Sequence, residues 1–453
     1  MRKLAVAFFM ILGLMANAVP AFADDNQVTV MTRNIYLGAD VGPAMKLLPN
    51  FSTAAQFMWD QVHKTDFSLR APKLAAEIVA EHPDVMAIQE ATTWVCTPGP
   101  FSKKVVVYDF VEQLLENTKA LGAEYVLASH DGKTAYNEGF AIDPIAMVTM
   151  AHDPQTFMPM FGKSDVACGF RIADVLLVRA DHAADVLAVG TTEYTKSYTI
   201  IPTIMTVHRG YSWADISIHG VPTRFVTTHL ESLFDSGKIP PAKIQTDQLI
   251  KDLGSATMPL VVMGDFNSDP RDPRPSSDPN LGAQPAQSDT CRAQAPNPTS
   301  ASADATCSPY WSIVQAGFTD LGPDATQSAN YSWGYTALLN GTDPMRPAGF
   351  TDRLDYVFTK NVVADNGAHL VGNTWPNGYD MWQCGAQVCA PTDHAGVVAT
   401  LTLPASAIQD SAPPAHKPIP IGFWKIIGAA CLAFIMRRVI RRRAERSRAP
   451  IAK

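Results

Sequence analysis

Two polar residues follow an apolar run near the middle of the chain. Residues 260–263 have the composition of a buried strand, Gly264 ends it, and Asp265 and Asn267 then stand two residues apart on the loop that follows. At a strand end, a carboxylate can orient or activate water, and an amide can donate to an anionic oxygen. The pair favours chemistry on a phosphate group, although a plain turn that tolerates unusual backbone angles explains the same residues.

Several other predicted strands carry a polar residue at one end. We expect strands over residues 28–32, 85–88, 125–128, 173–178, 213–218, 225–228, 353–358 and at the end of 393–401, and helices over 71–82, 109–121 and 241–253. The polar residues at strand ends are Asn34, Glu90, His229, Asp265 with Asn267, Asp355, and Asp393 with His394. Strand ends at one edge of a sheet can meet in space, so we expect these side chains to share one site.

Six motifs of this chain occur in the same order in a known family. They are Asn34 after the first strand, Pro83-Asp84-Val85-Met86-Ala87-Ile88-Gln89-Glu90, Thr228-His229-Leu230, Gly264-Asp265-Phe266-Asn267, Arg353-Leu354-Asp355-Tyr356, and Asp393-His394, where Thr392 stands in place of the family's serine. On these motifs, spread over residues 27–402, the chain resembles the endonuclease/exonuclease/phosphatase superfamily. The resemblance implies an α/β fold, a four-layer αββα sandwich of two packed mixed β-sheets with helices outside.

The resemblance also implies a divalent cation, Mg²⁺ or Mn²⁺, with Glu90 as its principal ligand. Asn34 and Asp393 would assist directly or through water, since hard cations prefer oxygen ligands. The cation would neutralise a phosphate oxygen and the charge that develops on the leaving group.

The remaining motif residues would take part in catalysis. Asp265 would orient and activate the attacking water, and His394, held by Asp355, would transfer protons. His229 and Asn267 would donate to the phosphate oxygens as charge builds. Asp355 has an alternative role as a buried structural partner of the arginine two residues before it. The implied enzyme is a hydrolase of phosphoric ester bonds, a metal-dependent phosphodiesterase or phosphatase.

One part of the family pattern has no clear counterpart in this chain. The family often has a substrate-ordering element near the middle of the sequence, and residues 143–211 do not align with it. Arg171, Asp174 and Arg179 could contact phosphate there, but paired surface charges are the favoured interpretation.

The two ends of the chain carry export and membrane signals. Residues 1–23 combine Arg2 and Lys3, an apolar run and small residues before Asp24, which is typical of a signal peptide; an uncleaved anchor is the alternative. Residues 419–436 form an apolar stretch followed by an arginine-rich tail, 437–453. We predict a C-terminal transmembrane anchor with a cytoplasmic tail, and an amphipathic surface helix or a processed sorting signal as alternatives.

Between the two ends we expect one catalytic domain, residues 24–405, and a linker, residues 406–418. The domain would lie on the outer side of the cytoplasmic membrane, periplasmic or extracellular. A tract rich in Pro, Ser, Ala and Asp, residues 269–308, has no periodicity and is predicted to be a surface insertion.

Cysteine usage agrees with export. Six cysteines outside the anchor permit several pairings, of which sequence proximity favours Cys291–Cys307 and Cys384–Cys389, leaving Cys96 with Cys168.

The charge balance limits the classes of substrate that the domain can bind. Residues 24–415 contain 24 Lys and Arg against 42 Asp and Glu, a net charge of −18. Such a domain does not offer the broad basic surface of a nucleic-acid-binding protein, so a phosphate must be held locally, through metal ions.

Three functions remain open. The favoured one is hydrolysis of phosphodiesters outside the membrane. The anchor and the apolar residues 157–161 suggest a phospholipid headgroup, although ordinary core explains 157–161 as well. An extracellular or periplasmic nuclease is the alternative, and a catalytically inactive, membrane-tethered binding domain is an alternative of another class. Neither a protein partner nor an oligomeric state is predicted.

Overall fold

The computed structural model describes residues 26–97, 103–149, 165–203, 205–233, 239–272, 305–334, 337–340, 350–373, 381–384 and 386–404. The predicted signal peptide, linker, anchor and tail, the apolar residues 157–161, and Cys291 lie outside these residues. Among the residues that are described, no helix is both long enough and apolar enough to cross a bilayer.

Most of the secondary structure is extended. The strands are β1 (Gln27–Asn34), β2 (Val85–Thr97), β3 (Val105–Asp109), β4 (Tyr125–Leu127), β5 (Ser129–His130), β6 (Lys133–Thr134), β7 (Tyr136–Thr149), β8 (Asp165–Arg179), β9 (Val186–Glu193), β10 (Tyr198–Ile201), β11 (Met205–Val207), β12 (Gly210–Ile218), β13 (Val221–His229), β14 (Leu260–Asp265), β15 (Thr319–Asp320), β16 (Asp355–Lys360), β17 (Val363–Val371), β18 (Trp382–Cys384), β19 (Gln387–Cys389) and β20 (Gly396–Thr402). The helices are α1 (Val41–Lys46), α2 (Phe51–Thr65), α3 (Phe67–Glu81), α4 (Phe110–Ala120), α5 (Pro241–Leu253) and α7 (Pro309–Gln315), with short 3₁₀ helices η1 (Ala180–Asp185) and η3 (Ser328–Asn330).

Two mixed sheets form the centre of the domain. The first has the order β17-β20-β1-β2-β8-β4, with β3 paired to β2 and β7 paired to β8. The second has the order β15-β16-β14-β13-β12-β9. Each sheet contains one parallel pair at its centre, β1 with β2 and β13 with β14, and antiparallel pairs on both sides.

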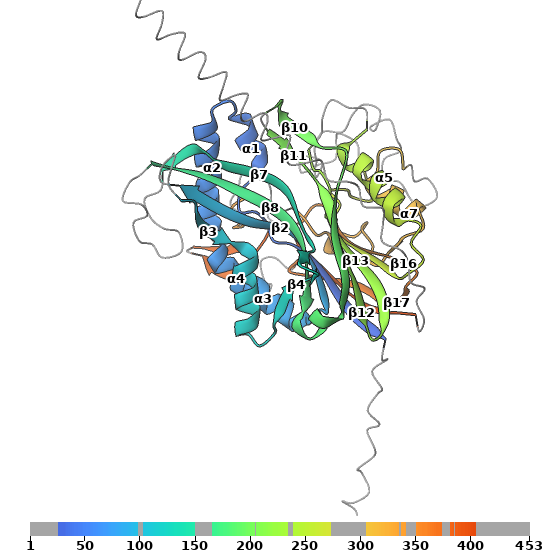
Figure 1. The fold of residues 1–453 in the computed structure, drawn as a ribbon. Helices are drawn as coiled ribbons and strands as arrows, with labels where there is room; N and C mark the ends of the chain where they lie inside the picture. Colours follow the sequence, from blue (N-terminus) through green and yellow to red (C-terminus); the bar gives the residue numbers. More distant parts are fainter. Residues whose placement is uncertain are drawn as a thin grey trace, which may run out of the picture. The chain divides into compact units, whose positions relative to one another are not determined.

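The sheets pack face to face and are covered by helices on their outer faces (Figure 1). Apolar residues such as Val30, Val85 and Leu176 of the first sheet meet Val261 and Val357 of the second in one buried core. The outer face of the first sheet packs against α2, α3 and α4, and that of the second against α5 and α7. This confirms the predicted four-layer αββα sandwich of two mixed sheets.

The predicted elements are found, with two differences. Helix α5 has the expected bounds, and α3 and α4 lie within a few residues of theirs. Strand β2 does not end at Glu90 as predicted but continues to Thr97. The tract predicted as a surface insertion has buried ends, since Asp269 and Ser308 are almost inaccessible to solvent, so both ends belong to the domain core.

Two predicted disulfides are confirmed. Cys96 and Cys168 join β2 to β8 at a directly paired position of the first sheet. Cys384 and Cys389 close the hairpin of β18 and β19. Cys307 is disulfide-bonded, while its predicted partner lies outside the described residues.

A buried ion pair connects the first sheet to its covering helix. The guanidinium of Arg33 in β1 contacts the carboxylate of Glu77 in α3 at 2.9 Å, and both side chains are fully buried. Arg33 also donates through Nη1 to the carbonyl oxygen of His394. Removing one partner of such a pair leaves an uncompensated charge in the interior.

We predict that Glu77→Gln lowers the free energy of unfolding by about 3–5 kcal/mol, because the Arg33 guanidinium then remains buried without a counter-charge. The measurement is chemical denaturation of the whole chain. The matched control is Glu124→Gln, which breaks the exposed pair with Lys119 and should cost no more than about 1 kcal/mol. Equal effects of the two substitutions would contradict this role of the buried pair.

Candidate active site

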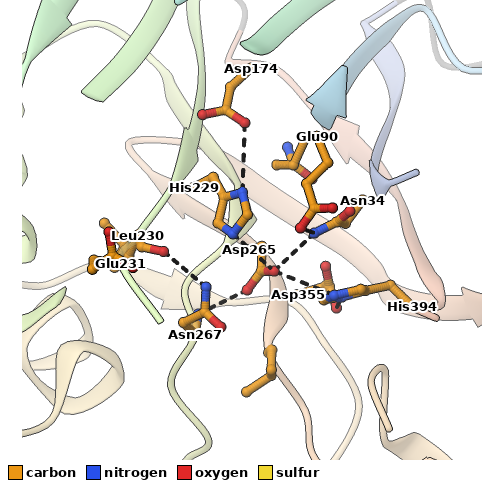
Figure 2. A network of polar contacts seen from close by, with 12 residues as sticks. Asn34, Glu90, Asp174, His229, Leu230, Glu231, Asp265, Asn267, Asp355 and His394 are labelled. Carbon is orange, nitrogen blue, oxygen red and sulfur yellow. Dashed lines mark hydrogen bonds and ion pairs between the residues drawn. The ribbon is translucent and has the colours of Figure 1, made fainter. Parts of the chain in front are cut away.

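The strand register brings four of the predicted residues to one end of the sandwich. In the second sheet, His229 pairs with Asp265 in the parallel ladder of β13 and β14, and Asp265 pairs with Asp355 in the antiparallel ladder of β14 and β16. In the first sheet, Asn34 is the last residue of β1. Figure 2 shows these side chains pointing toward one another.

A glycine permits the close approach of β13 and β14. Gly264 has a φ of +148°, and a β-carbon at this position would collide with the carbonyl oxygen of Thr228 in the neighbouring strand. Any other residue would push apart the strand ends that carry His229 and Asp265.

A β-bulge directs Glu90 into the site. Between the pairs Ile88–Val175 and Ala91–Ala173, two residues of β2 oppose the single residue Asp174 of β8. Glu90 therefore adopts a φ of +57°, which is rare for a residue with a side chain. Its carboxylate accepts from the backbone N–H of Leu37 at 2.6 Å, which fixes its direction.

Asp265 is the central contact of the cluster. Its Oδ2 accepts from the Asn34 amide at 3.1 Å and lies 3.5 Å from Nε2 of both His229 and His394. Its Oδ1 accepts from the backbone N–H of Asn267 at 2.9 Å. Burial raises the pKa of Asp265 to about 7, although the His394 charge opposes this rise. A carboxyl with a pKa near neutrality suits proton transfer.

His394 and Asp355 form a buried dyad. Nδ1 of His394 lies 2.8 Å from Oδ2 of Asp355. Burial alone would lower the pKa of His394, but the carboxylates of Asp355, Asp393 and Asp265 outweigh it and raise the pKa to about 10. The imidazole is therefore protonated at neutral pH. Arg353 pairs with Asp320 instead, so Asp355 is not its structural partner.

A short segment joins the two halves of this dyad. The Ser332 hydroxyl donates to Oδ2 of Asp355 at 2.6 Å, and the Ser332 carbonyl accepts from the backbone N–H of Ala395 at 2.6 Å. The next residue, Trp333, forms isolated bridges with Asp352 and His394. The segment therefore connects the start of β16, in the second sheet, to the start of β20, in the first.

His229 has the opposite electrostatic environment. Burial, together with the positive charges of Arg209 and His394, lowers the pKa of His229 well below its usual value. Its Nδ1 faces Oδ1 of Asp174 at 3.8 Å, and neither atom has a hydrogen-bond partner among the described residues. Burial raises the pKa of Asp174 to about 8. The site thus holds one neutral and one protonated histidine, a division suited to acid and base roles.

Asn267 and Asp393 lie at the margin of the cluster. The side-chain amide of Asn267 donates to the carbonyl oxygen of Leu230 at 2.9 Å, which leaves its second N–H for a ligand. Asp393 lies 4.0 Å from Nε2 of His394 through its Oδ1. Every residue predicted for the site is therefore found at this end of the domain.

The donor set fits a hard divalent cation. The carboxylates of Glu90 and Asp265 both contact the amide of Asn34, at 3.2 and 3.1 Å, so their oxygens converge on one point. Atoms of Asp265, Asp355 and His394 also lie close enough together to share an ion. Oδ1 of Asp355 is buried and has no hydrogen-bond partner among the described residues. Carboxylate and amide oxygens are the ligands that Mg²⁺ and Mn²⁺ prefer.

Asn34 differs from the simplest form of the prediction. It presents its amide nitrogen to the two carboxylates, and its oxygen accepts from the backbone N–H of Tyr36 at 3.0 Å. In this orientation Asn34 holds Glu90 and Asp265 in place, and it would need to rotate its amide to bind a cation itself.

The cluster opens into a cleft of about 440 Å³. Residues that the sequence did not single out line it, among them Arg209, Glu231 and Trp333. Arg209 lies in the unaligned region, with Nε 3.6 Å from the buried carboxylate of Glu231. The Trp333 ring centre lies 6.3 Å from that of His394. No local sequence pattern marks these three residues, because loops place them.

Asp174 is not the paired surface charge that the sequence analysis favours. It is 3% exposed and faces His229, whereas Arg179 does pair with Asp84 and Asp181, and Arg171 with Glu138. The signal that could have identified Asp174 is its position in a strongly apolar run, where an unpaired carboxylate is costly and therefore needs a function.

A family model matches residues 198–394, under the description Endonuclease/Exonuclease/phosphatase family. Residues 198–394, which make up less than half of the chain, are therefore similar to this family. The matched segment includes His229, Asp265, Asp355 and His394. The family supports the predicted class of enzyme, a hydrolase of phosphoric esters. Among curated proteins, none matches the sequence.

Solved structures with a similar fold are distant in sequence. An endonuclease/exonuclease/phosphatase family protein from Leptotrichia buccalis is 14% identical, with a TM-score of 0.43, over 83% of this chain and 99% of that chain. A mannosyl-6-phosphatase from Bacteroides thetaiotaomicron is 15% identical, with a TM-score of 0.38, over 83% and 99%. Truncated TDP2 from Caenorhabditis elegans is 13% identical, with a TM-score of 0.38, over 83% and 97%. These similarities are too distant to indicate a substrate.

We predict that Asp174→Asn lowers kcat on a phosphodiester by about 10–100-fold, because it replaces the carboxyl group that faces Nδ1 of the His229 ring. The measurement is steady-state kinetics with bis(p-nitrophenyl) phosphate and Mn²⁺. Asp215→Asn is the matched control, since Asp215 is a strand aspartate paired with Arg224 and does not line the cleft. An unchanged kcat in Asp174→Asn would remove Asp174 from the site.

Proposed function

We propose that the chain is a divalent-metal-dependent phosphodiesterase. The observation that carries this proposal is the convergence of Asp265 with Asn34, His229 and His394 beside Glu90 in a single cleft. A domain that only bound a ligand would not require a protonated and a neutral histidine on either side of a buried carboxylate.

The cation would be Mg²⁺ or Mn²⁺, held by Glu90 and Asp393, with Asn34 directing the carboxylates. As a metal ligand, Glu90 is favoured over the Asp355–His394 pair, because Nδ1 of His394 already contacts Asp355. Both Glu90 and Asp393 line the cleft. When bound, the metal supplies positive charge to a phosphate oxygen and to the leaving group.

The side chains of the cleft have separate tasks in this reaction. Asp265 orients the attacking water and accepts its proton, since its pKa of about 7 lies near the working pH. His394, which is protonated and held by Asp355, donates to the leaving group. His229 and Asn267 donate to the phosphate oxygens, and Arg209 adds positive charge at the cleft wall.

We predict that chelation of divalent metal abolishes hydrolysis of bis(p-nitrophenyl) phosphate by the 453-residue chain, and that added Mn²⁺ restores it. Asp265→Asn and His394→Asn should each lower kcat by about 10²–10⁴, because each removes a proton-transfer group. Glu90→Gln should raise the Mn²⁺ concentration needed for half-maximal activity.

The controls are the same changes at residues outside the cleft. Glu112→Gln, at the exposed start of α4, and His369→Asn, on the exposed side of β17, should keep the wild-type rate and metal requirement. Equal turnover in the wild type, Asp265→Asn and His394→Asn would overturn the proposed function and favour the inactive binding domain.

We also infer that the domain works outside the cytoplasmic membrane, tethered by residues 419–436. The Cys96–Cys168 and Cys384–Cys389 disulfides support this inference, since disulfides persist mainly in oxidising compartments. In a bacterial host, the chain should fractionate with membranes, carry oxidised cysteines and be cut by protease added outside spheroplasts. A chain found in the cytosolic fraction with reduced cysteines would contradict it.

A further inference from the structure

A second pocket adjoins the catalytic cleft. It has a volume of about 80 Å³ and lies between helices α1 and α2, the strands β7 and β8, and the hairpin of β10 and β11. Met45 and Ala55 come from the helices, Phe170 from β8, and Ile200 and Met205 from the hairpin. We call it the alkyl pocket.

Its wall, as far as the described residues form it, is almost entirely apolar. All of the residues that line it are aliphatic, aromatic or sulphur-containing, apart from Gly169. The two polar side-chain groups present are already satisfied, since Nε1 of Trp94 donates to the Leu37 carbonyl and Cys168 is in a disulfide. A sugar, a base or a second phosphate would lose its hydrogen bonds to water here without replacement.

The alkyl pocket adjoins the cleft. Val41 and Phe140 line both cavities. Helix α1 also contributes to both cavities. Its residues Ala44 and Met45 line the pocket, and Lys46 lines the cleft. A molecule with its phosphate beside Glu90 would reach these apolar surroundings by passing Val41 and Phe140, the two residues that the cavities share.

The volume suits a short hydrocarbon segment. One water-sized group needs about 10–15 Å³ on this measure, so the pocket holds roughly six methylene-sized groups. Burying each methylene contributes about fourfold to affinity. A chain of this length thus distinguishes an amphiphile from a nucleotide.

We propose that the alkyl pocket binds the hydrocarbon chain of an amphiphilic phosphate ester whose phosphate occupies the catalytic cleft. The proposal rests on the proposed function and narrows it to lipid-like substrates. The occupant is the substrate's own chain, because the two cavities share walls and because no polar side chain of the described residues lines the pocket.

The test separates binding from turnover. Ethyl-, butyl- and hexylphosphonate carry the head group on a bond that cannot be hydrolysed as an ester, and are titrated by calorimetry into the whole chain with Mn²⁺. Wild type should bind each longer chain more tightly, approaching fourfold per methylene. Ala55→Trp, which fills the pocket from α2, should bind all three alike. Thr53→Trp, on the exposed side of the same helix, is the control and should keep the dependence.

Turnover of bis(p-nitrophenyl) phosphate is measured on the same proteins and should be unchanged in Thr53→Trp, which lies outside both cavities. Met205→Gln, at a partly exposed pocket position, provides a milder change that should weaken hexylphosphonate binding. Wild-type affinities independent of chain length would overturn this inference. A chain-length dependence that survives in both Ala55→Trp and Met205→Gln would place the chain elsewhere and overturn it too. Absent turnover with intact chain-length dependence would overturn only the proposed function.

Discussion

The position of the Asp265 carboxylate depends on both sheets at once. It ends a strand of the second sheet, accepts from Asn34 of the first, and lies 3.5 Å from a histidine of each. Because its side chain is almost fully buried, its charge is tolerated only while those donors stay in place. The Asp265 carboxylate therefore depends on three backbone features. They are the parallel ladder of β13 and β14, the bulge in β2 and the turn before β20.

The same cluster has an excess of negative charge. Glu90, Asp174, Asp265, Asp355 and Asp393 gather at one end of the domain, where the described cations include Arg209, Lys46 and the protonated His394. Burial is the main cause of the raised pKa values of Asp174 and Asp265, and the neighbouring carboxylates add to it. A divalent ion relieves it, and it also lets an acidic domain of net charge −18 attract a phosphate at one point.

Residues whose position depends on local pattern could be placed from the sequence. His229 and Asp265 end apolar runs of parallel strands, so their meeting at one sheet edge could be predicted. The direction of Glu90 could not, because the bulge depends on the pairing of β2 with a distant strand. Asp174 was misjudged for a related reason. Its burial arises from the position of β8 inside the sheet, which the local charge pattern does not reveal.

The local sequence pattern also does not predict the helices beside the cleft. Neither α1 nor α2 was predicted, and together they form one wall of the alkyl pocket. The apolar side chains of α2 serve the outer core of the first sheet and the pocket at the same time. Composition alone cannot distinguish a side chain that packs in the core from one that lines the pocket, because both roles require the same residue types.

The segment Ser332–Trp333 has a mechanical consequence. Asp355 belongs to the second sheet and His394 precedes a strand of the first, so the proton-transfer pair spans the interface between two layers that could otherwise shear. Ser332 donates to Asp355 through its hydroxyl and accepts from the backbone N–H of Ala395 through its carbonyl, so it connects the two layers. If these hydrogen bonds of Ser332 were lost, a small shift of one sheet relative to the other would separate Asp355 from His394. Catalysis would then fail while the secondary structure of both layers remained intact.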